Sequence, residues 1–126
     1  MPIVLKNTAA ANVTYSIFRK SDNRAEYIGP AHTDLAKDLL VVTSTSPKQS
    51  ATSYGNRRSS VNYLASVSSP NPGGTTQVRD LKVEVSVSLP AGVTFAVLDE
   101  ALSRVAEAIS NDAIATDLFH IGKIDR

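Results

Sequence analysis

The sequence has no cysteine and only two histidines among its 126 residues. Disulfides and thiolate metal sites are therefore excluded, and His32 and His120 are too far apart in the sequence to form a metal-binding motif. The G-x-S-x-G motif of hydrolases does not occur, and Gly73-Gly74-Thr75 lacks the lysine and the following helix of a phosphate-binding loop. We therefore expect no enzyme active site, no bound metal and no cofactor.

Aromatic residues and long apolar runs are also scarce. Hydrophobic residues make up 42% of the chain but aromatic ones only 6%, so a core must consist mainly of valine, leucine, isoleucine and alanine. The longest aliphatic run, Leu39 to Val42, is far shorter than the roughly 20 residues of a membrane-spanning helix. The N-terminus has no secretory signal pattern. We therefore expect one soluble domain that is not secreted.

The net charge of +1 conceals an uneven distribution. Residues 37–88 carry six basic and three acidic side chains, whereas residues 89–126 carry three basic and six acidic ones. Phosphate contacts need cations with hydroxyl or amide donors, and residues 37–88 supply them. This favours a nucleic-acid partner, and the alternative is an ordinary solvated sheet with a mildly basic edge. Tyr54 is a candidate for base stacking, whereas Tyr63 is expected to face the core.

The clearest periodic pattern lies in residues 78–89, where apolar residues from Leu81 to Leu89 alternate with polar ones. This alternation predicts a strand of an antiparallel sheet with one buried and one solvated face. From Thr94 the period changes to three and four residues, which predicts an amphipathic helix with Thr94 as its N-cap. A shorter helix follows and ends near Gly122. Weaker strand patterns cover residues 3–5, 13–20, 25–28, 38–45 and 58–68.

This element order predicts an α+β fold. It comprises an N-terminal β-hairpin (1–20), a main antiparallel sheet of about five strands (25–89), and two C-terminal α-helices (94–121) on one face of the sheet. Because two short helices cover such a sheet poorly, we expect an interlocked dimer in which the helices of each subunit help to cover the partner's sheet. The helix residues assigned to this contact are Leu98, Leu102, Val105, Ile109 and Leu118.

The whole layout resembles the coat (capsid) proteins of single-stranded RNA bacteriophages, the levivirus family. The resemblance covers residues 1–126 as a single coat-protein domain. It is sharpest in VRDLKVEVSVSLPAGVTFAVLDEALSRVAEAISNDAIATDLF (residues 78–119) and in the loop SSPNPGGTTQ (residues 68–77) before it. It implies a structural protein that forms homodimers and then an icosahedral shell, or virus-like particle, around single-stranded genomic RNA. It also implies a location in the virion, assembly in the bacterial host cytoplasm, and neither a membrane nor a small-molecule substrate as partner.

The resemblance further implies which residues contact RNA and neighbouring dimers. An RNA hairpin, the translational operator, can bind the inner face of the sheet in this family. The implied RNA-binding residues are Thr43, Thr45 (or, one residue out of register, Ser44 and Ser46), Arg57, Arg58, Ser60, Asn62, Lys82, Glu84 and Ser86. The implied inter-dimer loop, which adapts to different shell positions, is Pro70, Asn71, Pro72, Gly73, Gly74, Thr75 and Thr76.

Two positions depart from the family pattern. Lys82 and Glu84 stand where relatives have an aromatic and an amide residue, so we expect charge-driven RNA packaging rather than recognition of a specific operator. The alternative function is a dimeric α+β binding module for a small molecule or peptide. Such a module predicts a concave apolar pocket.

Overall fold

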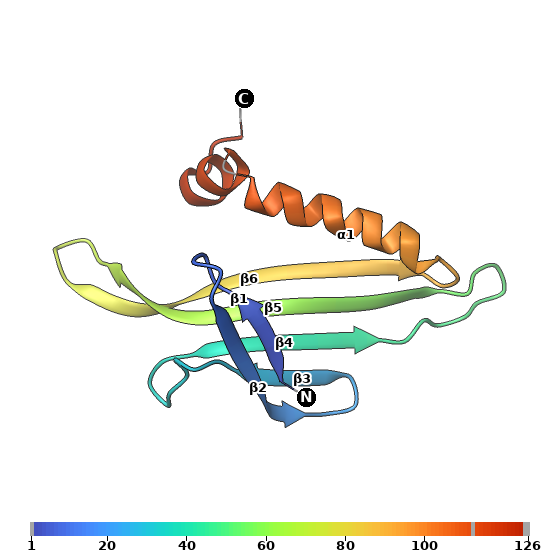
Figure 1. The fold of residues 1–126 in the computed structure, drawn as a ribbon, viewed down its shortest axis with the longest axis horizontal. Coiled ribbons are helices and arrows are strands. Elements are labelled where there is room, and N and C mark those ends of the chain that lie inside the picture. Colours follow the sequence, from blue (N-terminus) through green and yellow to red (C-terminus); the bar gives the residue numbers. More distant parts are fainter. Residues whose placement is uncertain (1, 112, 125–126) are drawn as a thin grey trace. The chain divides into compact units, whose positions relative to one another are not determined.

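The structure is a computed structural model that describes residues 2–111 and 113–124. The chain divides into two compact units, Met1–Pro90 and Ala91–Arg126, and each is considered by itself. Figure 1 shows strands throughout the first unit and helices in the second. No helix among the described residues is both long and apolar enough to cross a membrane.

The first unit is one antiparallel sheet whose six strands follow chain order (Figure 1). This agrees with the predicted α+β fold, but the strand count differs slightly, because the main sheet, predicted to have about five strands, has four, and the two strands of the N-terminal hairpin extend it to six. The strands are β1 (Ile3–Lys6), β2 (Asn12–Lys20), β3 (Arg24–Ile28), β4 (Asp38–Thr45), β5 (Asn56–Pro70) and β6 (Thr76–Pro90).

The N-terminal hairpin joins the sheet because β2 is long enough to pair twice. Its first half pairs with β1, from Lys6 opposite Asn12 to Ile3 opposite Tyr15. Its second half pairs with β3, and the register shifts between Ile17 and Arg19. Such a shift places an extra residue in one strand and increases the local twist. The sequence predicted both strands of the hairpin but not their continuity with the main sheet.

The β5–β6 hairpin is longer than expected, and its connecting loop is shorter. Pairing continues to Pro70 opposite Thr76, so five residues, Asn71–Thr75, replace the predicted ten-residue loop. Gly73 and Gly74 both have positive φ, 97° and 92°, the region that favours glycine. The Arg79 guanidinium donates to the side-chain oxygens of Ser69, Asn71 and Gln77. These contacts join Arg79 to residues on both sides of the tip of the hairpin.

The core of the first unit is small. Among the described residues the buried apolar side chains are Tyr15, Leu40 and Val41. Beside them lies Asp38, a carboxylate only 8% exposed. Its Oδ1 accepts a hydrogen bond from the Tyr15 hydroxyl at 2.7 Å, and its Oδ2 accepts one from the Ala31 amide at 3.3 Å. These bonds tie β2, β4 and the β3–β4 loop together.

Replacing Tyr15 by Phe is expected to lower the free energy of unfolding by about 1–3 kcal/mol, because the buried Asp38 loses a donor. Burial, and then the hydrogen bond and charge of Asp38, raise the pKa of the Tyr15 hydroxyl above its ordinary value. The Tyr15 hydroxyl therefore loses its proton at a lower pH in the unfolded chain than in the folded chain. The stabilisation by the Tyr15–Asp38 hydrogen bond is thus present below pH about 10 and is progressively lost above it. Urea unfolding at neutral and alkaline pH tests both statements. Tyr54→Phe, at a tyrosine 71% exposed, is the control, and equal losses in the two variants would contradict the prediction.

The second unit contains α1 (Phe95–Ser110) and η1 (Ala113–Ile121). Thr94 occupies the predicted N-cap position of α1, but its side chain makes no capping hydrogen bond. The predicted second α-helix is instead a π-helix, whose wider turns are rare in long runs. The described residues of α1 include no buried side chain. Its apolar row is therefore only partly covered, with Leu98 half-buried and Leu102 38% exposed. The prediction that both helices lie on one face of the sheet stays a prediction.

Candidate nucleic-acid interface

The strand register decides which residues of β4 share a face with those of β5 and β6. Residues directly opposite each other in an antiparallel pair lie on the same face. Thr43 is opposite Ser60, which is opposite Ser86, and Thr45 is opposite Arg58. The Thr43 and Ser60 hydroxyls are 2.6 Å apart. Thr43 and Thr45, rather than Ser44 and Ser46, therefore share a face with Ser60 and Ser86.

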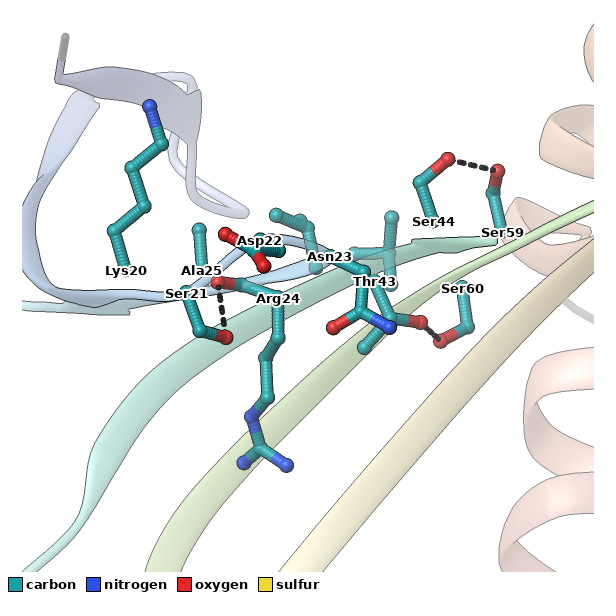
Figure 2. Close-up of a pocket in the computed structure, with 12 residues that line it drawn as sticks. Lys20, Ser21, Asp22, Asn23, Arg24, Ala25, Thr43, Ser44, Ser59 and Ser60 are labelled. Atoms are coloured by element: carbon teal, nitrogen blue, oxygen red, sulfur yellow. Dashed lines mark hydrogen bonds between the residues drawn. The ribbon is translucent and has the colours of Figure 1, made fainter. Parts of the chain in front are cut away.

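Figure 2 shows the two faces at this point of the sheet. The Thr43 and Ser60 side chains meet on one side, whereas Ser59 donates to Ser44 at 3.4 Å on the other. Lys20 extends from the same side as Ser44, and its Cα partner is Ala25. Ser44 thus belongs to the face that carries the valine rows of β5 and β6.

The polar face of the sheet collects eight of the nine residues predicted to bind RNA. The exception is Arg57, which is opposite Leu89 on the apolar face. Arg57 and Arg58 were predicted as a pair at the entrance of the strand, but successive residues of a strand point to opposite faces. We define the polar face as Thr43, Thr45, Arg58, Ser60, Asn62, Lys82, Glu84, Ser86 and Ser88.

Two hollows meet at Arg58. The first, about 350 Å³, is lined on the polar face by Thr43, Thr45, Arg58, Ser60, Ser86 and Ser88. The second, about 480 Å³, is lined by Thr45, Arg58 and residues of the β4–β5 loop that include Lys48. The hydroxyl groups and the two cations are donors that suit phosphate and sugar oxygens.

Sequence reasoning missed Arg24 as a member of this face. Arg24 is opposite Thr43, and its side chain extends on the same side as Thr43 and Ser60 (Figure 2). The predicted strand begins at Ala25, one residue after the start of β3, and therefore does not include Arg24. The signal that could have found it is the β3–β4 pairing, which a single sequence does not specify.

Carboxylates neutralise part of the positive charge near the polar face. Ion pairs join Arg24 to Glu26 at 2.8 Å, Lys37 to Asp80 at 3.0 Å and Lys82 to Glu84 at 3.6 Å. These pairs are largely solvated, so each is weak. For Arg58, no ion pair is found within the part of the chain that the structure describes. Of the two cations on the polar face, Lys82 is thus paired with a carboxylate, whereas Arg58 has no such pair among the described residues.

Two surfaces of the chain are accessible to another copy, namely the outer edge of β6 and the apolar side chains of the two helices. Within the described residues β6 pairs with β5 and with no other strand, so its second edge is free along fifteen residues. In the second unit Leu102, Val105, Ile109 and Leu118 are about two-fifths exposed, and Leu98 is half-buried.

Within the part of the chain that the structure describes, no group of three or more histidine, aspartate and glutamate side chains could hold a metal ion.

The comparisons with known proteins agree on the fold. Neither the protein-family models nor the curated proteins give a match to this sequence. Among solved structures, the virus-like particle of Beihai levi-like virus 32 matches with a TM-score of 0.79 and 16% identity, over 90% of this chain and 88% of that chain. The virus-like particle of bacteriophage AVE019 matches with a TM-score of 0.78 and 11% identity, over 99% and 97%. The coat protein of bacteriophage EMS014 matches with a TM-score of 0.62 and 16% identity, over 86% and 72%.

These likenesses extend over nearly the whole chain at low sequence identity. They confirm the predicted resemblance at the level of the fold, which is the one found in virus-like particles and coat proteins of levi-like phages. The low identity also explains why comparison of sequences alone finds nothing.

Proposed function

We propose that this chain, which has the fold of levi-like phage coat proteins, is itself a capsid protein that assembles into an icosahedral shell around single-stranded RNA. The observation that carries the proposal is the fold likeness to virus-like particles over nine-tenths or more of this chain. Because a fold alone does not imply a function, the free surfaces and the polar face are needed as further support.

The building block that we propose is a homodimer. A free edge of fifteen residues offers unpaired N–H and C=O groups to another strand, and a second copy of β6 is the partner of matching length. The apolar row of β6 supports this, because Leu81 and Val83 are 48% and 49% exposed. The apolar row of α1 is also partly exposed, with Leu102 38% and Val105 46% exposed. Interlocked helices from two copies would bury both rows, with Leu98, Leu102, Val105, Ile109 and Leu118 in the contact.

The RNA surface in this proposal is the polar face. Its support is the row of hydroxyls beside Arg58 and the hollow of about 350 Å³ that they line. Glu84 lies on the same face and repels phosphate, so general packaging is favoured over recognition of one operator hairpin. The implied location is the virion, with assembly in the bacterial host cytoplasm.

We expect Arg58→Ala to reduce the RNA content of purified particles and to weaken binding at every sequence tested. Each phosphate contact of a single strand contributes about 0.7 to the slope of log affinity against log salt. The variant should therefore lower this slope by about 0.7, which filter binding of RNA at several salt concentrations measures.

Arg57→Ala is the matched control, because Arg57 is the neighbouring cation on the apolar face. Its salt slope should equal that of the unchanged protein. If the two variants lose RNA equally, the polar face is not the RNA surface.

Electron microscopy of the expressed protein tests the assembly itself. Closed shells with co-purifying RNA are the expected result. A small dimer under all conditions, without shells or RNA, would favour the binding module. The hollows give that alternative little support, since the residues lining the two at Arg58 are mostly polar, whereas ligand pockets are mostly apolar.

A further inference from the structure

The β4–β5 loop (residues 46–55) has a closed conformation that its own residues maintain. Gly55 has φ of 84°, and a Cβ atom there would lie 2.3 Å from the carbonyl oxygen of Lys48. This approach of the two backbones needs glycine. The Ser50 amide donates to the Ser53 carbonyl at 2.8 Å, and the Gly55 amide donates to the Ser53 hydroxyl at 3.0 Å. The loop is therefore a preformed element at the end of the polar face.

This loop carries an aromatic ring that lines a hollow of about 210 Å³, and Ser53 lines both this hollow and a second one that two cations line. Tyr54 is 71% exposed, and it precedes the glycine that closes the loop. Lys48 and Arg58 line the adjoining hollow of about 480 Å³ together with Ser46 and Ser53. The sequence contains no aspartate or glutamate between Asp38 and Asp80, and within the described residues neither Lys48 nor Arg58 forms an ion pair.

The polar face itself has no aromatic ring among the described residues. Tyr63 is opposite Leu40 and Val83 on the apolar face, and the last strand has Lys82 and Glu84 on the polar face. Proteins that hold single strands combine a cationic groove with aromatic rings on which bases stack. Tyr54 is an exposed ring in the loop that contains Lys48, and the hollow that it lines shares Ser53 with the hollow that Lys48 and Arg58 line.

We propose that the β4–β5 loop is a separate subsite for an unpaired nucleotide of a single-stranded nucleic acid. The Tyr54 ring stacks on the base, and Lys48 and Arg58 bind the flanking phosphates. The base must be unpaired, because the face of a base within a duplex is covered by its stacked neighbours. The inference rests on the proposed function, since it takes RNA to be the partner, and it adds a base-stacking residue in a loop outside the sheet and a preference for single strands.

The test measures binding of a short oligoadenylate to the full-length protein, as a single strand and after annealing to oligouridylate. Tyr54→Ala should weaken single-strand binding about 5- to 100-fold, the range of one lost stacking contact, and should change duplex binding little. Tyr54→Phe should bind like the unchanged protein, because it keeps the ring. Lys48→Ala should lower the salt slope by about 0.7, whereas Tyr54→Ala should not.

Tyrosine emission gives a second readout, because the chain has four tyrosines and no tryptophan. A stacked base should quench the emission of the unchanged protein more than that of Tyr54→Phe. Gln49→Ala, in the same loop, is the control for a general effect of loop substitutions. Equal single-strand affinity for Tyr54→Ala and the unchanged protein would overturn the inference.

Electron microscopy of the same variants separates this inference from the proposed function. If Tyr54→Ala keeps its affinity for oligoadenylate and still forms shells that contain RNA, the subsite is refuted and the capsid function stands. An unchanged protein that binds no RNA and forms no shell would remove both.

Discussion

Replacing Asn71–Thr75 by a two-residue Asn-Gly turn is expected to leave dimers intact and to abolish the shell or change its size. Asn-Gly closes antiparallel hairpins, so β5 and β6 should remain paired. The tip itself should be lost as a contact between dimers. A Cβ atom added at Gly73 or Gly74 would meet no atom of a non-adjacent residue within 4 Å, so the tip lies in open space and contributes little to the stability of one chain. Size-exclusion chromatography and electron microscopy measure the two outcomes.

A graded variant of the same segment is Arg79→Ala. It removes the contacts to Ser69, Asn71 and Gln77 but keeps the length of the loop. In a shell of identical chains the tip meets different neighbours at different positions, so a less restrained tip should give particles of mixed size. Uniform particles of normal size from the Asn-Gly variant would show that the tip has no part in assembly.

Introducing a charge into the apolar row of α1 is expected to abolish the dimer. Val105 is 46% exposed within the chain, so Val105→Asp should be tolerated by an isolated subunit. In a dimer that buries this row, the carboxylate would lose its hydration at a cost of several kcal/mol. Symmetry places two such carboxylates in each dimer, so the dissociation constant should rise by orders of magnitude. Sedimentation and light scattering measure the loss, and shells should be absent.

The matched control is Ser103→Asp, on the polar side of the same helix. It adds the same charge and should leave both dimers and shells unchanged. A Val105→Asp protein that remains fully dimeric would remove α1 from the dimer contact. The β6 edge would then be the remaining candidate for that contact.

Several features of the fold could be predicted because they depend on local patterns. The alternation over Leu81–Leu89 and the change of period after Thr94 each correspond to one element of the structure, β6 and α1. The length of the tip was mispredicted, because proline and glycine between residues 68 and 77 indicate a turn but not where pairing stops. The π-helical geometry of Ala113–Ile121 was also missed, since the apolar spacing there suits an α-helix.

The sequence by itself determined which side chains are available: an alternating strand with serines, a lysine and a glutamate on one face, and cations without nearby acids in the middle of the chain. The tertiary structure alone decided which of them lie together. The pairing of Thr43 with Ser60 and of Ser60 with Ser86 puts Thr43 rather than Ser44 on the polar face, and the pairing of Arg24 with Thr43 places Arg24 on the same side. The pairing of Arg57 with Leu89 puts Arg57 on the other face from Arg58. The physical reason is that strand pairing joins residues distant in the sequence, and a shift of one residue moves every side chain of a strand to the other face.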